Sequence, residues 1–210
     1  MSAIWLRRLI LVLAAVVLQA AVLKAALPTN PQEAPARPSL AGQLLVASPS
    51  MGDPRFERAV ILIVQDDPTG AVGIVVNKPM GERTLASLFE ALGQKAGGLA
   101  GDVQVYSGGP VQPELGFVVH SADYHRPDTV IINDHLSMTS SLEILSDIGK
   151  RKGPTKSLVA FGYAGWGAGQ LEDEIEQGAW GTAEADSKLI FDEERERVWD
   201  DAWTRRTQHL

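Results

Sequence analysis

The stretch that decides the fold is Phe161–Trp180, FGYAGWGAGQLEDEIEQGAW, in which four glycines within eight residues lead into a strongly acidic segment. Glycine adopts positive φ angles and allows close backbone approach, and Tyr163, Trp166 and Trp180 supply large rigid surfaces beside these glycines. The pattern predicts a tight turn packed against aromatic side chains, followed by a short helix over residues 170–177.

The glycine run lacks the spacing of a phosphate-binding loop. Gly-x-Gly-x-x-Gly counted from Gly165 requires glycine where Gln170 stands, and no Gly-Lys-Ser/Thr follows. The next helix begins with three acidic residues whose carboxylates occupy the positive field at a helix N-terminus and would repel phosphate. We therefore expect a structural turn, followed by a solvated helix face that carries Glu172, Glu174 and Glu176.

Charge is distributed unevenly along the 210 residues. Residues 1–39 hold four Lys or Arg and one acidic residue, a net charge of +3, so residues 40–210 carry −10 of the total of −7. Such an acidic domain repels nucleic acid phosphates, so no nucleic acid partner is predicted. The chain has no cysteine, and its four histidines show no metal-ligand spacing. The sequence therefore predicts neither a metal site nor a cofactor.

The N-terminus has the pattern of a targeting segment. Leu9 to Leu23 is apolar except for Gln19, with Arg7 and Arg8 before it. We interpret residues 1–27 as an N-terminal signal or membrane anchor and residues 28–39 as a Pro-rich linker. An uncleaved anchor, a cleaved signal peptide and an interfacial segment all fit this pattern. The prediction is a membrane-anchored or periplasmic protein, with residues 9–27 as the only segment suited to contact a membrane.

Residues 40–210 are predicted to form one α+β domain. Strands are expected over residues 43–47, 59–64, 71–76, 103–106, 116–120, 129–132, 157–161 and 188–191. Helices are expected over residues 84–92, 141–148, 170–177 and 193–203, the second with a capping box formed by Ser140 and Glu143. Strands and helices without regular alternation, with a hairpin over residues 59–76, favour a mixed, largely antiparallel sheet.

Several motifs, in this order and at this spacing, resemble the bacterial AlgH/YqgE family. They are LAGQLLVASP (40–49), DPRFER (53–58), GIVVNKP (73–79), SGGPV (107–111), FGYAGWGAGQLEDEI (161–175), Trp180 and Trp199. The resemblance implies a bifurcated or barrel-like sheet flanked by helices. It also implies a cytosolic location, as the alternative to a membrane-anchored or periplasmic one. The biochemical activity of the family is undefined.

The distinctive residues are of types that shape and recognise, so we expect a non-catalytic binding or adaptor domain whose partner is a protein or a small molecule. The candidate binding residues are Asn77, Lys78, Ser107, Gly108, Gly109, Tyr163, Trp166 and Gln170. One alternative is a hydrolase-like enzyme with a polar cleft around Asn77, Lys78 and Tyr163. Another is a transcriptional regulator, as the family label suggests, which the acidity of the domain opposes.

Overall fold

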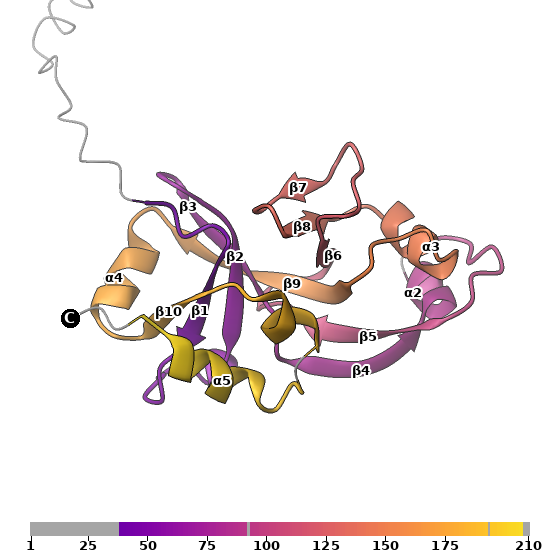
Figure 1. Ribbon diagram of the computed structural model, residues 1–210. Coiled ribbons are helices and arrows are strands. Elements are labelled where there is room, and N and C mark those ends of the chain that lie inside the picture. Colours follow the sequence, from indigo (N-terminus) through magenta and orange to yellow (C-terminus); the bar gives the residue numbers. More distant parts are fainter. Residues whose placement is uncertain (1–37, 92, 193, 208–210) are drawn as a thin grey trace, which may run out of the picture. The chain divides into compact units, whose positions relative to one another are not determined.

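The computed structural model describes residues 38–91, 93–192 and 194–207 (Figure 1). All of these residues except Pro38 belong to one compact unit that begins at Ser39. The predicted signal or anchor over residues 1–27, and all but the end of the linker, lie outside the described residues. None of the helices in the described ranges has the length and apolar character required to span a membrane.

Ten strands and several short helices make up the described domain. The strands are β1 (Gln43–Ala47), β2 (Val60–Asp67), β3 (Gly70–Val75), β4 (Pro79–Thr84), β5 (Asp102–Ser107), β6 (Val111–Ser121), β7 (Val130–Ile131), β8 (Leu136–Thr139), β9 (Ser157–Gly167) and β10 (Trp180–Glu184). The helical elements are η1 (Pro54–Phe56), α2 (Leu85–Ala91), α3 (Glu143–Gly149), α4 (Gln170–Glu176), η2 (Lys188–Asp192) and α5 (Val198–Arg205).

The strands form a mixed sheet with a branch at β9. Its main path runs β10-β1-β2-β3-β9-β6-β8-β7, and β4 joins β9 through β5. The β5–β9 pair is parallel and the other strand pairs are antiparallel. Helices flank this sheet, with α4 and α5 beside the β1–β10 side and α2 and α3 at the β4–β5 side (Figure 1). The predicted α+β fold with a bifurcated, largely antiparallel sheet is confirmed.

Strand β9 forms the branch because its two halves have different partners. Val159 in the first half pairs with β5 on one side and β6 on the other, whereas Gly167 in the second half pairs with β3. Gly162, with φ of +75°, lies between the two halves. The expected turn over the glycine run is wrong, since the strand continues to Gly167. The alternation of buried and exposed residues from Ala164 to Gly167 explains this, because period-two burial is typical of a strand.

The Ser107-Gly108-Gly109 corner connects the two arms of the branched sheet. The amide of Gly108 donates to the Phe161 carbonyl at 2.7 Å, and its carbonyl accepts from Val75 N–H at 2.8 Å. A Cβ atom at Gly108 would lie 2.3 Å from the Gly162 carbonyl oxygen, and one at Gly109 would lie 2.1 Å from the carbonyl carbon of Tyr163. Only glycine fits this backbone crossing, which explains the paired glycines.

Apolar residues are buried in three clusters around the sheet. The first, around Leu62 and Ile190, includes Trp199 of α5. The second, around Ile61 and Trp180, includes Leu171 of α4. The third, which contains Leu85 of α2, Ile144 of α3 and Val159 of β9, lies between the sheet and these two helices.

Strands β4, β8 and β10 lie on residues for which no strand was predicted, and three further local predictions differ from the structure. Residues 188–191, expected as a strand, lie in the π-helical η2, because a short apolar run fits either conformation and Asp186 accepts from the Lys188 amide at its start. The capping box is wrong, since α3 begins at Glu143 and its N-cap Leu142 makes no side-chain cap. The last helix begins at Val198 rather than at residue 193. The hairpin is confirmed, with β2 and β3 joined by two residues.

Candidate functional site

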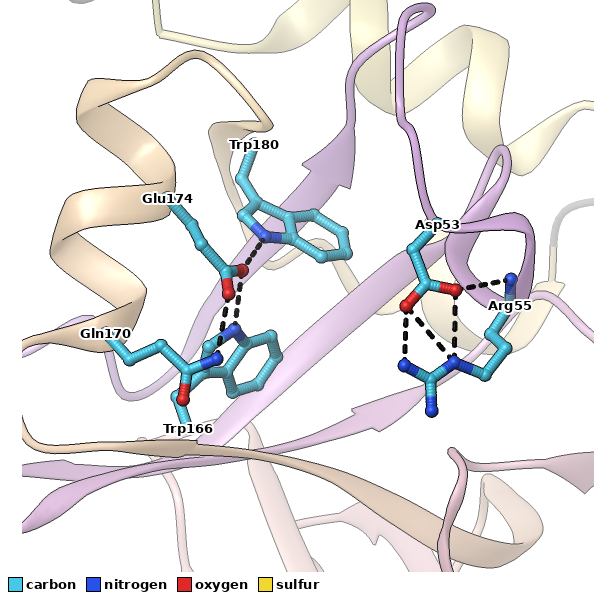
Figure 2. Close-up of polar contacts among 6 residues, drawn as sticks. All are labelled: Asp53, Arg55, Trp166, Gln170, Glu174 and Trp180. Carbon is cyan, nitrogen blue, oxygen red and sulfur yellow. Dashed lines mark hydrogen bonds and ion pairs between the residues drawn. The ribbon is translucent and has the colours of Figure 1, made fainter.

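The short helix η1 orients one arginine at the surface. Asp53 caps this helix by accepting from the Arg55 amide at 2.9 Å, and Pro54 suits the first helical position. The Asp53 carboxylate also accepts from Arg55 Nε at 3.0 Å and Nη2 at 2.6 Å (Figure 2). These hydrogen bonds lower the pKa of Asp53 and raise that of Arg55. Among the described residues nothing accepts from Arg55 Nη1, so this nitrogen keeps two N–H donors.

A pocket of about 260 Å³ lies beside this arginine. Its lining residues come from η1, the end of β3 and the glycine corner, and are Arg55, Phe56, Val75, Lys78, Ser107, Gly109 and Pro110. The Lys78 ammonium donates to the Glu57 carbonyl at 2.5 Å and has two further N–H donors. The Ser107 hydroxyl has no hydrogen-bond partner in the part of the chain that the structure describes. The pocket thus combines cationic and hydroxyl donors with an aromatic wall, and we call it the Arg55 pocket.

The aromatic wall of the Arg55 pocket rests on two buried indoles. Phe56 contacts Trp180 edge to face, with ring centroids 5.5 Å apart, and Trp180 contacts Trp166 in the same manner at 6.0 Å. Both tryptophans are core residues, with 4% and 7% of their surface exposed, as predicted. Edge-to-face pairs favour one mutual orientation, so the indoles position the Phe56 ring.

The two indoles share one carboxylate. Glu174 Oε2 accepts from Trp166 Nε1 at 2.9 Å and from Trp180 Nε1 at 2.8 Å, and Gln170 Nε2 donates to Oε1 of the same group at 2.9 Å (Figure 2). The expectation that Glu174 lies on a solvated helix face is therefore wrong. The half-buried carboxylate satisfies two indole N–H groups that would otherwise be buried without a partner.

The eight candidate residues fall into separate places. Lys78, Ser107 and Gly109 line the Arg55 pocket, Gly108 makes the backbone crossing beside it, and Trp166 and Gln170 belong to the indole–carboxylate cluster. Two others lie apart from the pocket lining. Asn77 is buried, accepting from the Val60 amide at 2.9 Å and donating to the Arg58 carbonyl at 2.8 Å. Tyr163 contacts the edge of Phe117, with ring centroids 6.2 Å apart.

Sequence reasoning missed four residues of the pocket, Arg55, Phe56, Val75 and Pro110. The Asp53-Pro54-Arg55 motif has a signal that could have found the first, because aspartate followed by proline is typical of a helix start and fixes the next residue. In the described ranges no group of three His, Asp or Glu lies close enough together to hold a metal ion.

Comparison with known proteins assigns the chain to a family. A family model described as AlgH-like matches residues 44–210. A UPF0301 protein of Jannaschia sp. (strain CCS1) is 48% identical over 165 residues, which cover 78% of this chain and 86% of the relative. One from Rhizorhabdus wittichii is 45% identical over 170 residues, 81% of this chain and 90% of the relative.

Solved structures agree with this assignment. The solution structure of the AlgH protein from Pseudomonas aeruginosa is similar, with a TM-score of 0.69 and 36% identity over 85% of this chain and 91% of that protein. A crystal structure of a protein from Corynebacterium diphtheriae shares the fold, with a TM-score of 0.63 and 22% identity over 82% of this chain and 90% of that chain. On sequence and on fold, the chain belongs to the AlgH-like family.

Proposed function

We propose that this chain is a non-catalytic binding domain whose Arg55 pocket receives an anionic group attached to an apolar body. One observation carries the proposal: the donors of Arg55, Lys78 and Ser107 line a single pocket in a domain whose net charge is −10. The concentration of these donors at one concave site on an otherwise acidic domain favours recognition of an anion.

The geometry supports an anion with an apolar body. Arg55 Nη1 and the remaining Lys78 donors supply charge-assisted hydrogen bonds, and Ser107 adds a neutral donor. Asp53 offsets part of the positive charge and fixes the guanidinium, so less side-chain entropy is lost when a ligand binds. Phe56, together with Val75 and Pro110 in the same lining, gives an apolar surface of the kind that small-molecule sites use.

The same groups argue for binding without catalysis. Ser107 has no hydrogen bond to a base in the described structure, and a serine nucleophile needs one. The carboxylate of Asp53 is held by Arg55, which lowers its pKa, whereas an effective general base has a pKa close to the working pH. The hydrolase alternative would need the Asn77 side chain to be available to a substrate. Its amide oxygen and its amide nitrogen, however, are both hydrogen-bonded to backbone groups.

The partner and the location are part of the proposal. We expect the ligand to be a small molecule or an acidic group on a protein. We expect no nucleic acid to bind, because the net charge of −10 on the domain would repel a phosphate backbone that extends beyond this small pocket. From residues 1–27 we propose a membrane-anchored or periplasmic protein, with the cytosol as the alternative that the family resemblance implies. Cell fractionation with sizing of the mature chain tests the location.

Isothermal titration with benzoate and with phenyl phosphate tests the binding function. We expect saturable binding of one ligand per chain, weakened roughly tenfold by Arg55→Ala and by Lys78→Ala, because each removes hydrogen bonds to a charged group. Lys152→Ala, an exposed lysine outside the pocket, is the matched control and should leave binding unchanged. Absence of saturable binding to either anion, or equal losses in all three variants, would contradict the proposal.

A further inference from the structure

A second pocket, of about 360 Å³, lies between β6, β9 and the start of α3, and shares no lining residue with the Arg55 pocket. Its walls are predominantly apolar, with side chains that include those of Leu115, Leu142, Leu145, Val159 and Phe161. Its volume falls within the range of about 300–1,000 Å³ that is usual for small-molecule sites.

The pocket results from an irregularity of β6. Val111 pairs with Tyr163, and Gly116 pairs with Phe161. Between these two pairs β6 advances by five residues and β9 by only two, so the additional residues of β6 form a bulge. Gln112, within this bulge, has φ of +46°, a conformation that residues other than glycine seldom adopt. The bulge leaves Leu115 43% exposed at the pocket. Bulges commonly mark sites where a sheet is reshaped for function.

One buried polar atom among the lining residues lacks a partner in the described structure. Ser141 lines the pocket, and its hydroxyl oxygen is buried with no hydrogen bond in the part of the chain that the structure describes. Its backbone N–H, by contrast, donates to Asp128 at 3.2 Å. Native proteins seldom leave a buried hydroxyl without a partner, since it loses its hydrogen bonds to water for no gain. The oxygen is closed off in its present rotamer, so the hydroxyl must rotate about χ1 before a ligand oxygen in the pocket can accept from it and provide the missing bond.

The charge beside the pocket selects against anions. Glu114, an exposed residue of the bulge, also lines the pocket, and no Lys or Arg is among its lining residues. We therefore propose that this pocket binds a small uncharged molecule that has an apolar body and one carbonyl oxygen, which accepts a hydrogen bond from Ser141. The site is independent of the Arg55 pocket and differs from it in the ligand charge that it accepts.

Three related probes test the proposal, with the methyl signals of Leu142, Leu145 and Val159 followed by NMR during titration. Acetophenone has the aryl body and the carbonyl, ethylbenzene has the body alone, and benzoate adds a negative charge. We expect acetophenone to bind about fivefold more tightly than ethylbenzene, the usual effect of one neutral hydrogen bond, and benzoate to leave these signals unshifted.

Substitutions separate the hydroxyl from the apolar walls. Ser141→Ala should bring acetophenone down to the affinity of ethylbenzene, whose own affinity should not change, and the midpoint of unfolding should not fall because the hydroxyl has no partner to lose. Ser146→Ala, in the helix that follows Ser141 but outside the lining, is the control. Leu115→Ser should weaken both neutral probes, whereas Ile131→Ser, also exposed, should weaken neither.

The results that would overturn the proposal are equally specific. Equal affinity for acetophenone and ethylbenzene, or an equal loss of both in Ser141→Ala, would show that the hydroxyl takes no part. Shifts of the pocket methyl signals by benzoate alone, or no saturable shift with either neutral probe, would show that the pocket does not bind this class of ligand.

Discussion

Trp180 at the start of β10 donates its indole N–H to the carboxylate of Glu174 in α4 at a distance of 2.8 Å. The same carboxylate oxygen accepts from Trp166 in β9, so one group connects a helix to two strands. Phe56 lines the Arg55 pocket and contacts Trp180 edge to face. The hydrogen bond from Trp180 to Glu174 therefore helps to orient a wall of this pocket, although Glu174 is not among the lining residues.

Replacing Glu174 should destabilise the domain. Glu174→Ala leaves two largely buried indole N–H groups without an acceptor, and we expect a loss of about 2–4 kcal/mol in the free energy of unfolding. Glu174→Gln keeps one acceptor oxygen and should lower the free energy of unfolding by less. Urea denaturation measures both, with Glu176→Ala, an exposed residue of the same helix, as the control. If Glu174→Ala lowered the free energy of unfolding no more than the control does, the shared carboxylate would not stabilise the fold.

Asn77 should affect stability rather than recognition. Its side chain satisfies the Val60 amide and the Arg58 carbonyl, so Asn77→Ala should lower the free energy of unfolding by about 2–4 kcal/mol. Asn77→Asp retains the acceptor for Val60 and should be intermediate. In a urea titration the free energy of unfolding should decrease in the order wild type, Asn77→Asp, Asn77→Ala. A stable Asn77→Ala variant that no longer binds benzoate or phenyl phosphate would reverse this assignment.

The glycine corner should not tolerate a side chain. Gly109 has φ of +152°, and a Cβ atom there would overlap the backbone of Tyr163. Gly109→Ala should therefore cost more than about 3 kcal/mol or prevent folding, because backbone atoms on both sides must move. Gly52, whose Cβ would meet nothing within 4 Å, gives the control Gly52→Ala. Thermal unfolding that left the two variants equal would contradict the close crossing at Gly109.

Stability should fall on mild acidification through His120. This fully buried ring donates from Nδ1 to the Ser121 carbonyl at 2.9 Å, and in its neutral form Nε2 accepts from the Thr139 hydroxyl at 3.0 Å. Burial lowers its pKa below the ordinary value of 6.5, although the Ser121 hydrogen bond and the charge of Asp123 oppose this effect. The stabilising contribution is therefore complete above pH 6.5.

The sign of this effect follows from proton binding. Below pH 6.5 the unfolded chain binds a proton at His120 that the folded chain does not, so unfolding is favoured as the pH falls towards the folded pKa. Urea titrations between about pH 7 and pH 5 should show declining stability in the wild type and a flatter profile in His120→Gln. The exposed His135→Gln is the control and should keep the wild-type slope. Equal slopes in both variants would contradict the assignment.

The sequence predicted those elements in which one residue pattern dominates without a competing signal. Strand β1 and helix α4 were predicted almost residue for residue, since apolar runs and glycine stops define them. The glycine run was misjudged because Gly165 and Gly167 occupy the exposed positions of a strand whose buried residues include Trp166. Turn propensity and strand periodicity conflict there, and pairing with β3, which the local sequence does not encode, decides the outcome.

The candidate site was harder to predict because its members come from distant segments. Lys78 and Ser107 were singled out from local motifs, and the contact between η1 and the glycine corner that adds Arg55 is a tertiary one. The function of Glu174 was hidden for another reason. Its indole partners lie on strands, eight residues before it in β9 and six residues after it in β10, so no helical spacing links them to Glu174.

The measurement that tests the central claim most directly is a ¹H–¹⁵N NMR titration of the intact chain with phenyl phosphate. We expect the largest saturable shifts at the Arg55 side-chain Nε–H and at the amides of Ser107 and Gly109, all reduced in Lys78→Ala and unchanged in Lys152→Ala. Saturable shifts confined to residues outside the Arg55 pocket, or no saturable shift at all, would contradict the claim that this pocket recognises an anionic group.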